Sequence, residues 1–194
     1  MIKRIEEFVK YINSYPIELY GEFGLQHELA FYFRNNYDDI KVYLEYPTTK
    51  IFGRSNTKSF IKKEIDLYII NSKNQKFVIE LKMPKSDSGT PNEMYRAIED
   101  VKFLEQLKLN NIDGCYSILF TNDVAFYNAK RANSSIYNKF NGKQVKINSL
   151  SLLEMPVFLH KKGPINLNNV YTSEWSTYSD INKQDWKYYI LEIK

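Results

Sequence analysis

The sequence predicts an α/β fold in which helices flank a central mixed β-sheet. Two apolar runs of strand length, 64–70 and 76–83, surround the polar turn 71–75, which indicates an antiparallel hairpin. A helical pattern over 92–110 separates this hairpin from the short apolar run 116–120. A helix between two strands indicates a crossover connection, so we expect the last strand to run parallel to a neighbouring strand of the hairpin.

Two helices and a strand are expected ahead of the hairpin. Apolar residues recur every three or four positions from Ile2 to Ile12, an amphipathic helical pattern that Pro16 stops. A second helix is expected over 21–36 and a first strand over 41–46. The polar segment 47–63 that follows is expected to form a loop.

The pattern is weaker beyond residue 122. Three short apolar runs are candidate strands, at 145–147, 156–159 and 188–193. The sequence contains no internal repeat and no low-complexity segment that would mark a second domain. We therefore expect a single domain over 1–194, with its core at about 21–122. The sequence does not indicate a role for the C-terminal part, 123–194.

Composition indicates a globular protein, with 43% hydrophobic and 26% charged residues. No apolar run approaches the roughly 18 residues that a membrane span requires, and charges interrupt the N-terminus where a signal peptide is apolar. We therefore expect a cytoplasmic protein with no membrane partner. The single cysteine, Cys115, excludes an intrachain disulfide and a cysteine-based zinc site. The two histidines, His27 and His160, have no partner at ligand spacing.

The hairpin carries an uncommon set of charges. Counting back along both arms from the turn places Asp66 opposite Glu80 and Glu64 opposite Lys82, with all four side chains on one face. Like charges directly opposite each other destabilise a sheet, and charges inside apolar strands are costly unless something pairs them. A divalent cation between the two carboxylates would remove both costs. The alternative is an exposed face on which acids and lysines form weak cross-strand pairs.

An Asp on one strand followed by Glu-x-Lys on the next resembles the active-site signature of the PD-(D/E)xK nuclease superfamily, the restriction-endonuclease-like fold. Asp66 matches the metal-binding Asp of that family, and Glu80, Leu81 and Lys82 match its Glu-x-Lys. Ile65 stands where the signature has a proline, a residue that many members lack. The resemblance implies a restriction-endonuclease-like arrangement of the mixed sheet and its helices.

The resemblance spans roughly residues 21–122 and implies phosphodiester hydrolysis with Mg²⁺, for which Mn²⁺ would substitute. Asp66 and Glu80 would bind the metal through their carboxylates, with the Leu81 carbonyl as a third protein ligand. Lys82 would orient or deprotonate the attacking water, or stabilise the developing negative charge. These alternatives remain open from the sequence.

Two helices offer further candidate site residues. The family commonly carries a Glu on a helix ahead of the first strand, and Glu28 is the candidate, reaching the metal through water. Glu28 falls on or beside an apolar stripe, where an unpaired carboxylate is uncommon, which favours a functional role. The alternative is a Glu at the margin of the stripe that pairs with a neighbouring cation. The family often places a polar residue, frequently Gln, on the helix after the Glu-x-Lys strand. Arg96, Glu99, Asp100 and Gln106 fall on the polar side of that helix, and neither Gln106 nor Arg96 can be aligned with the family's position.

Basic residues gather in two segments that lack acidic residues. Segment 47–63 contains Lys50, Arg54, Lys58, Lys62 and Lys63, and segment 129–146 contains Lys130, Arg131, Lys139, Lys143 and Lys146. Cations clustered beside Asn, Ser and Thr suit contacts with phosphates. We expect the first segment to bind nucleic acid through Lys50, Arg54, Lys58 and Lys62, because it leads into the Asp66 strand. A solvated loop is the alternative for both segments.

Together these patterns predict a magnesium-dependent endonuclease acting on nucleic acid, most simply DNA, in a defence, mobile-element or repair context. One active site cuts one strand, so duplex cleavage would favour a homodimer. One alternative is a binding or scaffold domain of the same fold that does not cleave, although Asp66, Glu80 and Lys82 are all present. Another is an RNA-directed nuclease such as a toxin, because metal-site chemistry does not distinguish DNA from RNA.

Overall fold

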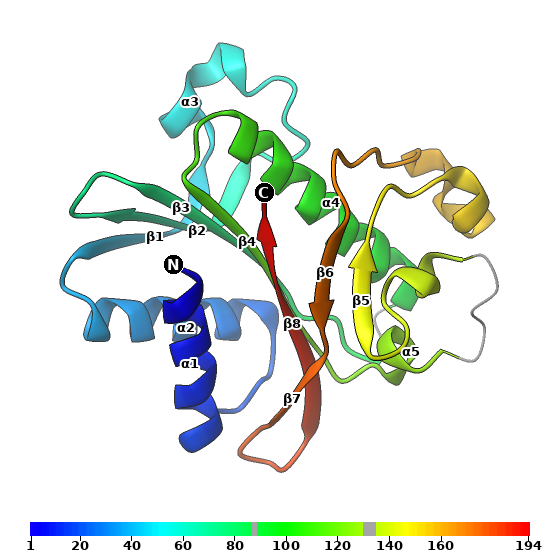
Figure 1. The fold of residues 1–194 in the computed structure, drawn as a ribbon, viewed down its shortest axis with the longest axis horizontal. Coiled ribbons are helices and arrows are strands. Elements are labelled where there is room, and N and C mark those ends of the chain that lie inside the picture. Colours follow the sequence, from blue (N-terminus) through cyan, green and yellow to red (C-terminus); the bar gives the residue numbers. More distant parts are fainter. Residues whose placement is uncertain (87–88, 130–134) are drawn as a thin grey trace.

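The computed structural model describes residues 1–86, 89–129 and 135–194, and it has an α/β architecture with a mixed six-stranded sheet in the order β1-β2-β3-β4-β8-β7 (Figure 1). The strands are β1 (Ile40–Pro47), β2 (Glu64–Asn71), β3 (Lys76–Lys82), β4 (Gly114–Thr121), β5 (Gln144–Ile147), β6 (Tyr171–Glu174), β7 (Ser176–Ser179) and β8 (Asp185–Ile193). The helices are α1 (Ile2–Ser14), α2 (Glu22–Asn36), α3 (Thr49–Asn56), α4 (Thr90–Leu109) and α5 (Val124–Tyr127), with 3-10 turns η1 (Ile136–Lys139), η2 (Leu152–Glu154) and η3 (Val157–Lys162). No helix in these described ranges is long and apolar enough to cross a membrane.

The two N-terminal helices cover one face of the sheet (Figure 1). The expected apolar stripe of α1 is buried, with Ile5 and Ile12 fully shielded from solvent. In α2, Leu29 and Phe33 are likewise buried. They pack with apolar side chains from that face of the sheet, such as Leu67 of β2, in one buried cluster. Both helices begin and end within about two residues of their expected bounds, because Pro16 and the extended residues after Asn36 interrupt them.

Strands β1, β2 and β3 form an antiparallel meander. The expected hairpin register is confirmed, because Ile70 pairs with Lys76 and Tyr68 pairs with Val78. The pairing ends at Leu67 opposite Ile79, one residue before the two acidic side chains would face each other. Tyr68 and Val78 belong to the cluster that α4 covers, so this face of the hairpin is buried rather than an exposed charged face.

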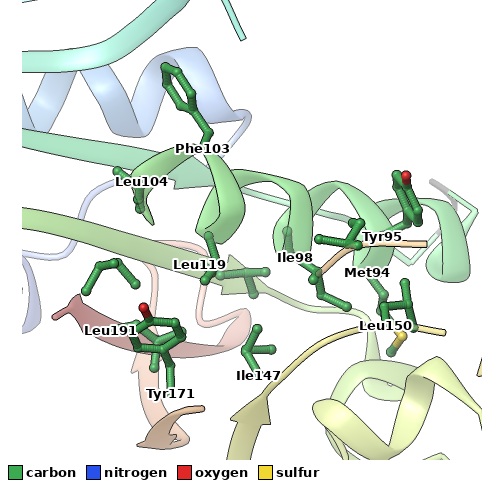
Figure 2. Packing of buried hydrophobic residues seen from close by; sticks show 14 of the residues in the cluster. Met94, Tyr95, Ile98, Phe103, Leu104, Leu119, Ile147, Leu150, Tyr171 and Leu191 are labelled. Carbon is green, nitrogen blue, oxygen red and sulfur yellow. The ribbon is translucent and has the colours of Figure 1, made fainter. Parts of the chain in front are cut away.

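Helix α4 connects β3 to β4 as a crossover, and β4 lies parallel to β3, as expected. Figure 2 shows Met94, Ile98 and Leu104 of α4 packed with Leu119 of β4 and Ile147 of β5. Thus α4 is covered by the large sheet and also by the small β5-β6 sheet. A helix enclosed in this way buries side chains around much of its circumference, including some that the sequence pattern placed on a polar side.

The C-terminal part completes the sheet. Strand β8 pairs with β4 and carries β7 at the edge, whereas β5 and β6 form the separate two-stranded sheet. The expected strands at 145–147 and 188–193 are confirmed. The expected strand at 156–159 is wrong, because residues from Val157 form the 3-10 turn η3, in which Val157 and Phe158 are exposed.

The expected loop over 47–63 is also partly wrong, because it contains the helix α3. Gly53 interrupts that helix with φ 78°, a left-handed value that glycine adopts without a steric penalty. The remainder is fastened to α4. Gln106 accepts a hydrogen bond from the Ile61 amide (3.1 Å) and donates one to the Ser59 carbonyl (3.0 Å), while the Phe60 ring packs edge-on against Phe103.

Candidate active site

The candidate site lies at one end of the sheet, where β1 and β3 finish and β2 begins. Pro47, the last residue of β1, pairs with Glu64, the first residue of β2. Lys82 is the last residue of β3 at the same end. The start of α2 also reaches this end, because Glu22 accepts a hydrogen bond from the Met83 amide (3.2 Å). Helix α3 follows directly on β1, so the basic segment leaves the sheet beside this site.

The carboxylates of Asp66 and Glu80 replace the missing strand pairing. Asp66 Oδ2 accepts a hydrogen bond from the Leu81 amide (2.7 Å), and Glu80 Oε1 accepts one from the Asp66 amide (3.3 Å). One oxygen of each carboxylate is therefore fixed to the backbone. Buried backbone donors need partners, and here the two acids provide them.

The carbonyl of Asp66 also bonds outside the strand ladder. Gln26 of α2 donates hydrogen bonds of 2.7 Å from Nε2 to both the Asp66 carbonyl and Glu45 Oε1. Glu45 has φ 46°, so β1 is distorted beside Asp66. The β1–β2 pairing passes from Leu44–Leu67 to Tyr46–Ile65 across this distortion. Gln26 of α2 and Glu80 of β3 thus hold the Asp66 backbone in place, and Glu45 of β1 in turn fixes Gln26.

The second oxygens of both carboxylates face the ammonium group of Lys62. Lys62 Nζ contacts Glu80 Oε2 and lies 4.0 Å from Asp66 Oδ1. It also donates a 3.0 Å hydrogen bond to Asp100 Oδ1 of α4. The Glu80 side chain is fully buried, whereas 27% of the Lys62 side chain is exposed. A single positive charge therefore sits at the point where three acidic groups meet.

Lys82 makes a second set of ion pairs beside the first. Its Nζ lies 3.3 Å from Glu22 Oε1 and 3.4 Å from Asp100 Oδ2. Only 7% of the Lys82 side chain is exposed. Asp100 lies between the two lysines and has one oxygen facing each, so it fixes their separation.

The electrostatics of the cluster reflect burial opposed by neighbouring charges. Burial raises the pKa of Asp66 to about 6, although Lys62 acts in the opposite direction. Burial and then the charge of Asp66 raise the pKa of Glu80 well above its usual value. For Lys62, burial lowers the pKa, but Glu80, Asp100 and Asp66 outweigh it and the pKa lies above its usual range. For Lys82, burial also lowers the pKa, but the charges of Asp100 and Glu22 outweigh it, so the pKa is raised as well.

The structure brings Asp66, Glu80 and Lys82 into one cluster, in which the Leu81 amide donates a hydrogen bond to Asp66 Oδ2. Glu28 has no described bond to this cluster: 41% of its side chain is exposed, and its ion-pair neighbour is His27, with 3.9 Å between His27 Nδ1 and Glu28 Oε1. Glu22, at the start of the same helix, reaches the site instead.

Helix α4 contributes Asp100, which the sequence pattern assigned to a polar side. Its position three residues after Ala97 and four before Leu104, both buried, is the signal that would have placed it on an inner face. Gln106 anchors the segment before β2, and Arg96 pairs with Glu93, so neither contacts the cluster through the bonds described.

The basic residues of 47–63 divide into two groups. Lys50, Arg54 and Lys58 are exposed, and Lys50 Nζ lies 5.5 Å from the centre of the Tyr46 ring. Lys62, also expected to contact nucleic acid, is instead held in the acidic cluster. Lys63 donates hydrogen bonds to the Thr57 and Phe60 carbonyls.

The second basic segment contains a buried lysine. Lys139 Nζ bonds to Asn148 Oδ1 (2.6 Å), the Ser149 carbonyl (2.7 Å) and Glu154 Oε1 (2.9 Å), and this residue is 3% exposed. It therefore holds loops together and is not available to phosphates in this arrangement. Lys130 and Arg131 lie outside the described residues.

Comparison of the chain with models of known families, with curated proteins and with solved structures found no match. The resemblance to the PD-(D/E)xK nucleases therefore rests on the residues themselves and on their arrangement.

The donor set suits a hard divalent cation. Among the described residues, no group of three or more His, Cys, Asp or Glu side chains is arranged to hold a metal ion. However, Mg²⁺ binds through one or two carboxylates, keeps several waters and prefers oxygen ligands. Asp66 Oδ1 and Glu80 Oε2 already face one cation, the Lys62 ammonium, whereas the Leu81 carbonyl stays a predicted third ligand. These residues fit a metal that has two carboxylate ligands.

Proposed function

We propose that this chain is a metal-dependent endonuclease in which Asp66 and Glu80 bind Mg²⁺ and Lys82 contacts the scissile phosphate. One observation carries the proposal: each carboxylate is fixed through one oxygen to a backbone amide, and their other oxygens face a common cation. This preorganisation is what a catalytic metal site requires, because ligands that are already positioned need no rearrangement in the transition state.

The metal would neutralise charge on the phosphate and lower the pKa of a bound water, which supplies the nucleophile. The chain positions the other groups. Lys82, held by Asp100 and Glu22, has a raised pKa and is therefore protonated at neutral pH. This favours a role in stabilising negative charge over a role as general base, a choice that the sequence left open.

The overall architecture supports a restriction-endonuclease-like core. The meander β1–β3, the crossover helix α4 and the parallel strand β4 give the mixed sheet flanked by helices that the resemblance implies. The Asp and the Glu-x-Lys fall on neighbouring strands at one end of this sheet. Cleavage of a duplex would require two such sites, for which a homodimer is the simplest arrangement.

The exposed residues Lys50, Arg54 and Lys58 support nucleic acid as the substrate. They lie on or next to α3, which leaves the sheet at the same end as the acidic cluster. Cations at this position would attract a polyanion and hold its phosphates near the site. This charge is equally suited to DNA and RNA, so DNA is proposed on the family resemblance and RNA is an outcome of the test.

A second candidate function is nucleic-acid binding without cleavage. One observation favours it: Lys62 already pairs with Glu80 and Asp100, so the acidic cluster has a cation of its own. In that case the ion pairs would have a structural role and would not belong to a catalytic site.

The experiment that separates the two functions incubates the purified protein with supercoiled plasmid, single-stranded DNA and RNA, in Mg²⁺, in Mn²⁺ and in chelator. We expect metal-dependent cleavage by the wild type and its loss in Asp66→Asn and Glu80→Gln, with nucleic-acid binding retained within a few-fold. Asp38→Asn, at an exposed position distant in sequence, is the matched control and should cleave normally. Binding without cleavage of any substrate would support the second function, and cleavage by Asp66→Asn at the wild-type rate would contradict the assigned site.

A further inference from the structure

The ammonium of Lys62 occupies the position towards which the free oxygens of the candidate metal ligands point. Its Nζ contacts Glu80 Oε2 and lies 4.0 Å from Asp66 Oδ1. The remaining oxygens, Asp66 Oδ2 and Glu80 Oε1, are engaged by the Leu81 and Asp66 amides. The oxygens that Lys62 faces have no backbone partner, so they are the ones through which a metal would bind both side chains with least disturbance of these bonds.

Metal and ammonium would exclude each other at this point. Metal–oxygen distances for Mg²⁺ are about 2.0–2.1 Å, which leaves no room for an ammonium group between the same oxygens. Two cations in direct contact in a buried setting also repel strongly. The Lys62 side chain must therefore move before the metal can bind both carboxylates.

Lys62 also has a route out of the cluster. Its side chain is 27% exposed, unlike the side chains of Glu80 (0%) and Asp100 (6%). It lies in the short segment between α3 and β2, outside any helix or strand. The neighbouring residues of that segment are fixed to α4 through Gln106, so the lysine side chain can swing outward without displacing its backbone.

We propose that Lys62 is an internal counter-ion that holds the metal site in the metal-free protein and competes with the divalent cation. In the metal-free state its charge offsets the cost of burying Glu80 beside Asp66 and Asp100. When metal binds, the ammonium is released towards the basic surface of 47–63, where it becomes available to a substrate phosphate. This inference rests on the proposed metal site.

The test measures metal binding in the absence of nucleic acid. Calorimetric titration of Mg²⁺ and of Mn²⁺ into wild type and Lys62→Met would compare their affinities, because Met keeps an unbranched side chain and removes the charge. We expect Lys62→Met to bind metal about 5-fold more tightly or better, the lower end of the usual range for coupled ligands. Lys73→Met, in the hairpin turn at the other end of the sheet, removes an exposed charge and should match the wild type.

The outcomes separate this inference from the proposed function. Equal or weaker metal binding by Lys62→Met, with clear binding by the wild type, overturns the counter-ion role and leaves the metal site standing. Absence of metal binding in all three proteins overturns the metal site and this inference with it.

A measurement on the wild type alone covers the case in which Lys62→Met does not fold. Amine-reactive labelling followed by mass spectrometry reports the accessibility of each lysine in chelator and in Mg²⁺. We expect labelling of Lys62 to increase several-fold in Mg²⁺, because its ammonium leaves the carboxylates, while labelling of Lys73 stays constant. Unchanged labelling of Lys62 at a metal concentration that saturates the protein would overturn the proposal.

Discussion

Asp100 Oδ2 lies 3.4 Å from Lys82 Nζ, and its other carboxylate oxygen accepts a hydrogen bond from Lys62. A residue of the crossover helix thus links the lysine of the Glu-x-Lys strand to the lysine that precedes the Asp66 strand. Asp100 is 4% exposed, and the two ammonium groups that face it compensate for the cost of burying its carboxylate.

Replacing Asp100 by Asn should destabilise the protein and impair any cleavage. The amide keeps the shape but removes the charge that holds both lysines, and loss of a buried charged partner costs about 1–3 kcal/mol. Chemical denaturation in chelator would measure the change in the free energy of unfolding. Glu99→Gln on the same helix is the control and should change it by less, because Glu99 is partly exposed. An Asp100→Asn variant as stable as the wild type would show that the lysines do not depend on this carboxylate.

The metal-free protein should gain stability as the pH falls from 7 to 5. Burial raises the pKa of Asp66 to about 6 from its usual value of 3.8, so between these values the folded state binds more protons than the unfolded state. The contribution of Asp66 to the free energy of unfolding therefore decreases as the pH rises through about 4 to 6. Glu80, whose pKa is also raised, acts in the same direction.

The variant Asp66→Asn isolates the contribution of Asp66 to that pH dependence. At pH 7 in chelator it should be more stable than the wild type by about 1 kcal/mol, because the buried charge is gone. The difference should shrink towards pH 5 as Asp66 becomes protonated. Calorimetric melting at several pH values measures both effects. A variant less stable than the wild type at pH 7 would mean that its pairing with Lys62 outweighs the cost of burial.

Removing Lys50, Arg54 and Lys58 together, each replaced by Gln, should weaken nucleic-acid binding for all sequences. For duplex DNA, each lost phosphate contact reduces the slope of the logarithm of the binding constant against the logarithm of the salt concentration by about one unit. Fluorescence anisotropy at several salt concentrations would measure the slope. Loss of binding to one sequence alone would instead indicate base recognition, and an unchanged slope would leave these residues as ordinary solvated surface.

Replacing Lys139 by Met should destabilise the protein and leave the salt dependence of nucleic-acid binding unchanged. Its ammonium satisfies Asn148, Ser149 and Glu154, and leaving such groups without a partner costs about 1–3 kcal/mol. Thermal melting and anisotropy measure the two properties. Lys146→Met, at an exposed position in the same segment, should leave stability unchanged. A change in the salt dependence of binding for Lys139→Met would instead show that Lys139 contacts phosphates.

The sequence by itself determined strands β1 to β4 and β8 of the sheet and the pairing of its central hairpin, whereas the edge strand β7 was not predicted. Local signals suffice there, because an apolar run, a polar turn and the period of a strand determine which residues face each other, as Ile70 and Lys76 do. The bounds of α1, α2 and α4 followed for the same reason, from Pro16 and from the spacing of apolar residues, whereas α3 was not predicted. The same periodicity placed Asp66, Glu80 and Lys82 on one face.

Only the tertiary structure decided which other side chains complete the cluster. Asp100 is buried because its side of α4 faces Lys62 and Lys82, whose ammonium groups lie near its two carboxylate oxygens. Glu22 rather than Glu28 forms an ion pair with Lys82, because α2 approaches the site with its first turn. Lys62 carries the same charge as its exposed neighbours, yet the anchoring of its segment to Gln106 directs it inward. Ion pairs of this kind join residues distant in the chain, and a pattern of local spacing carries no information about them.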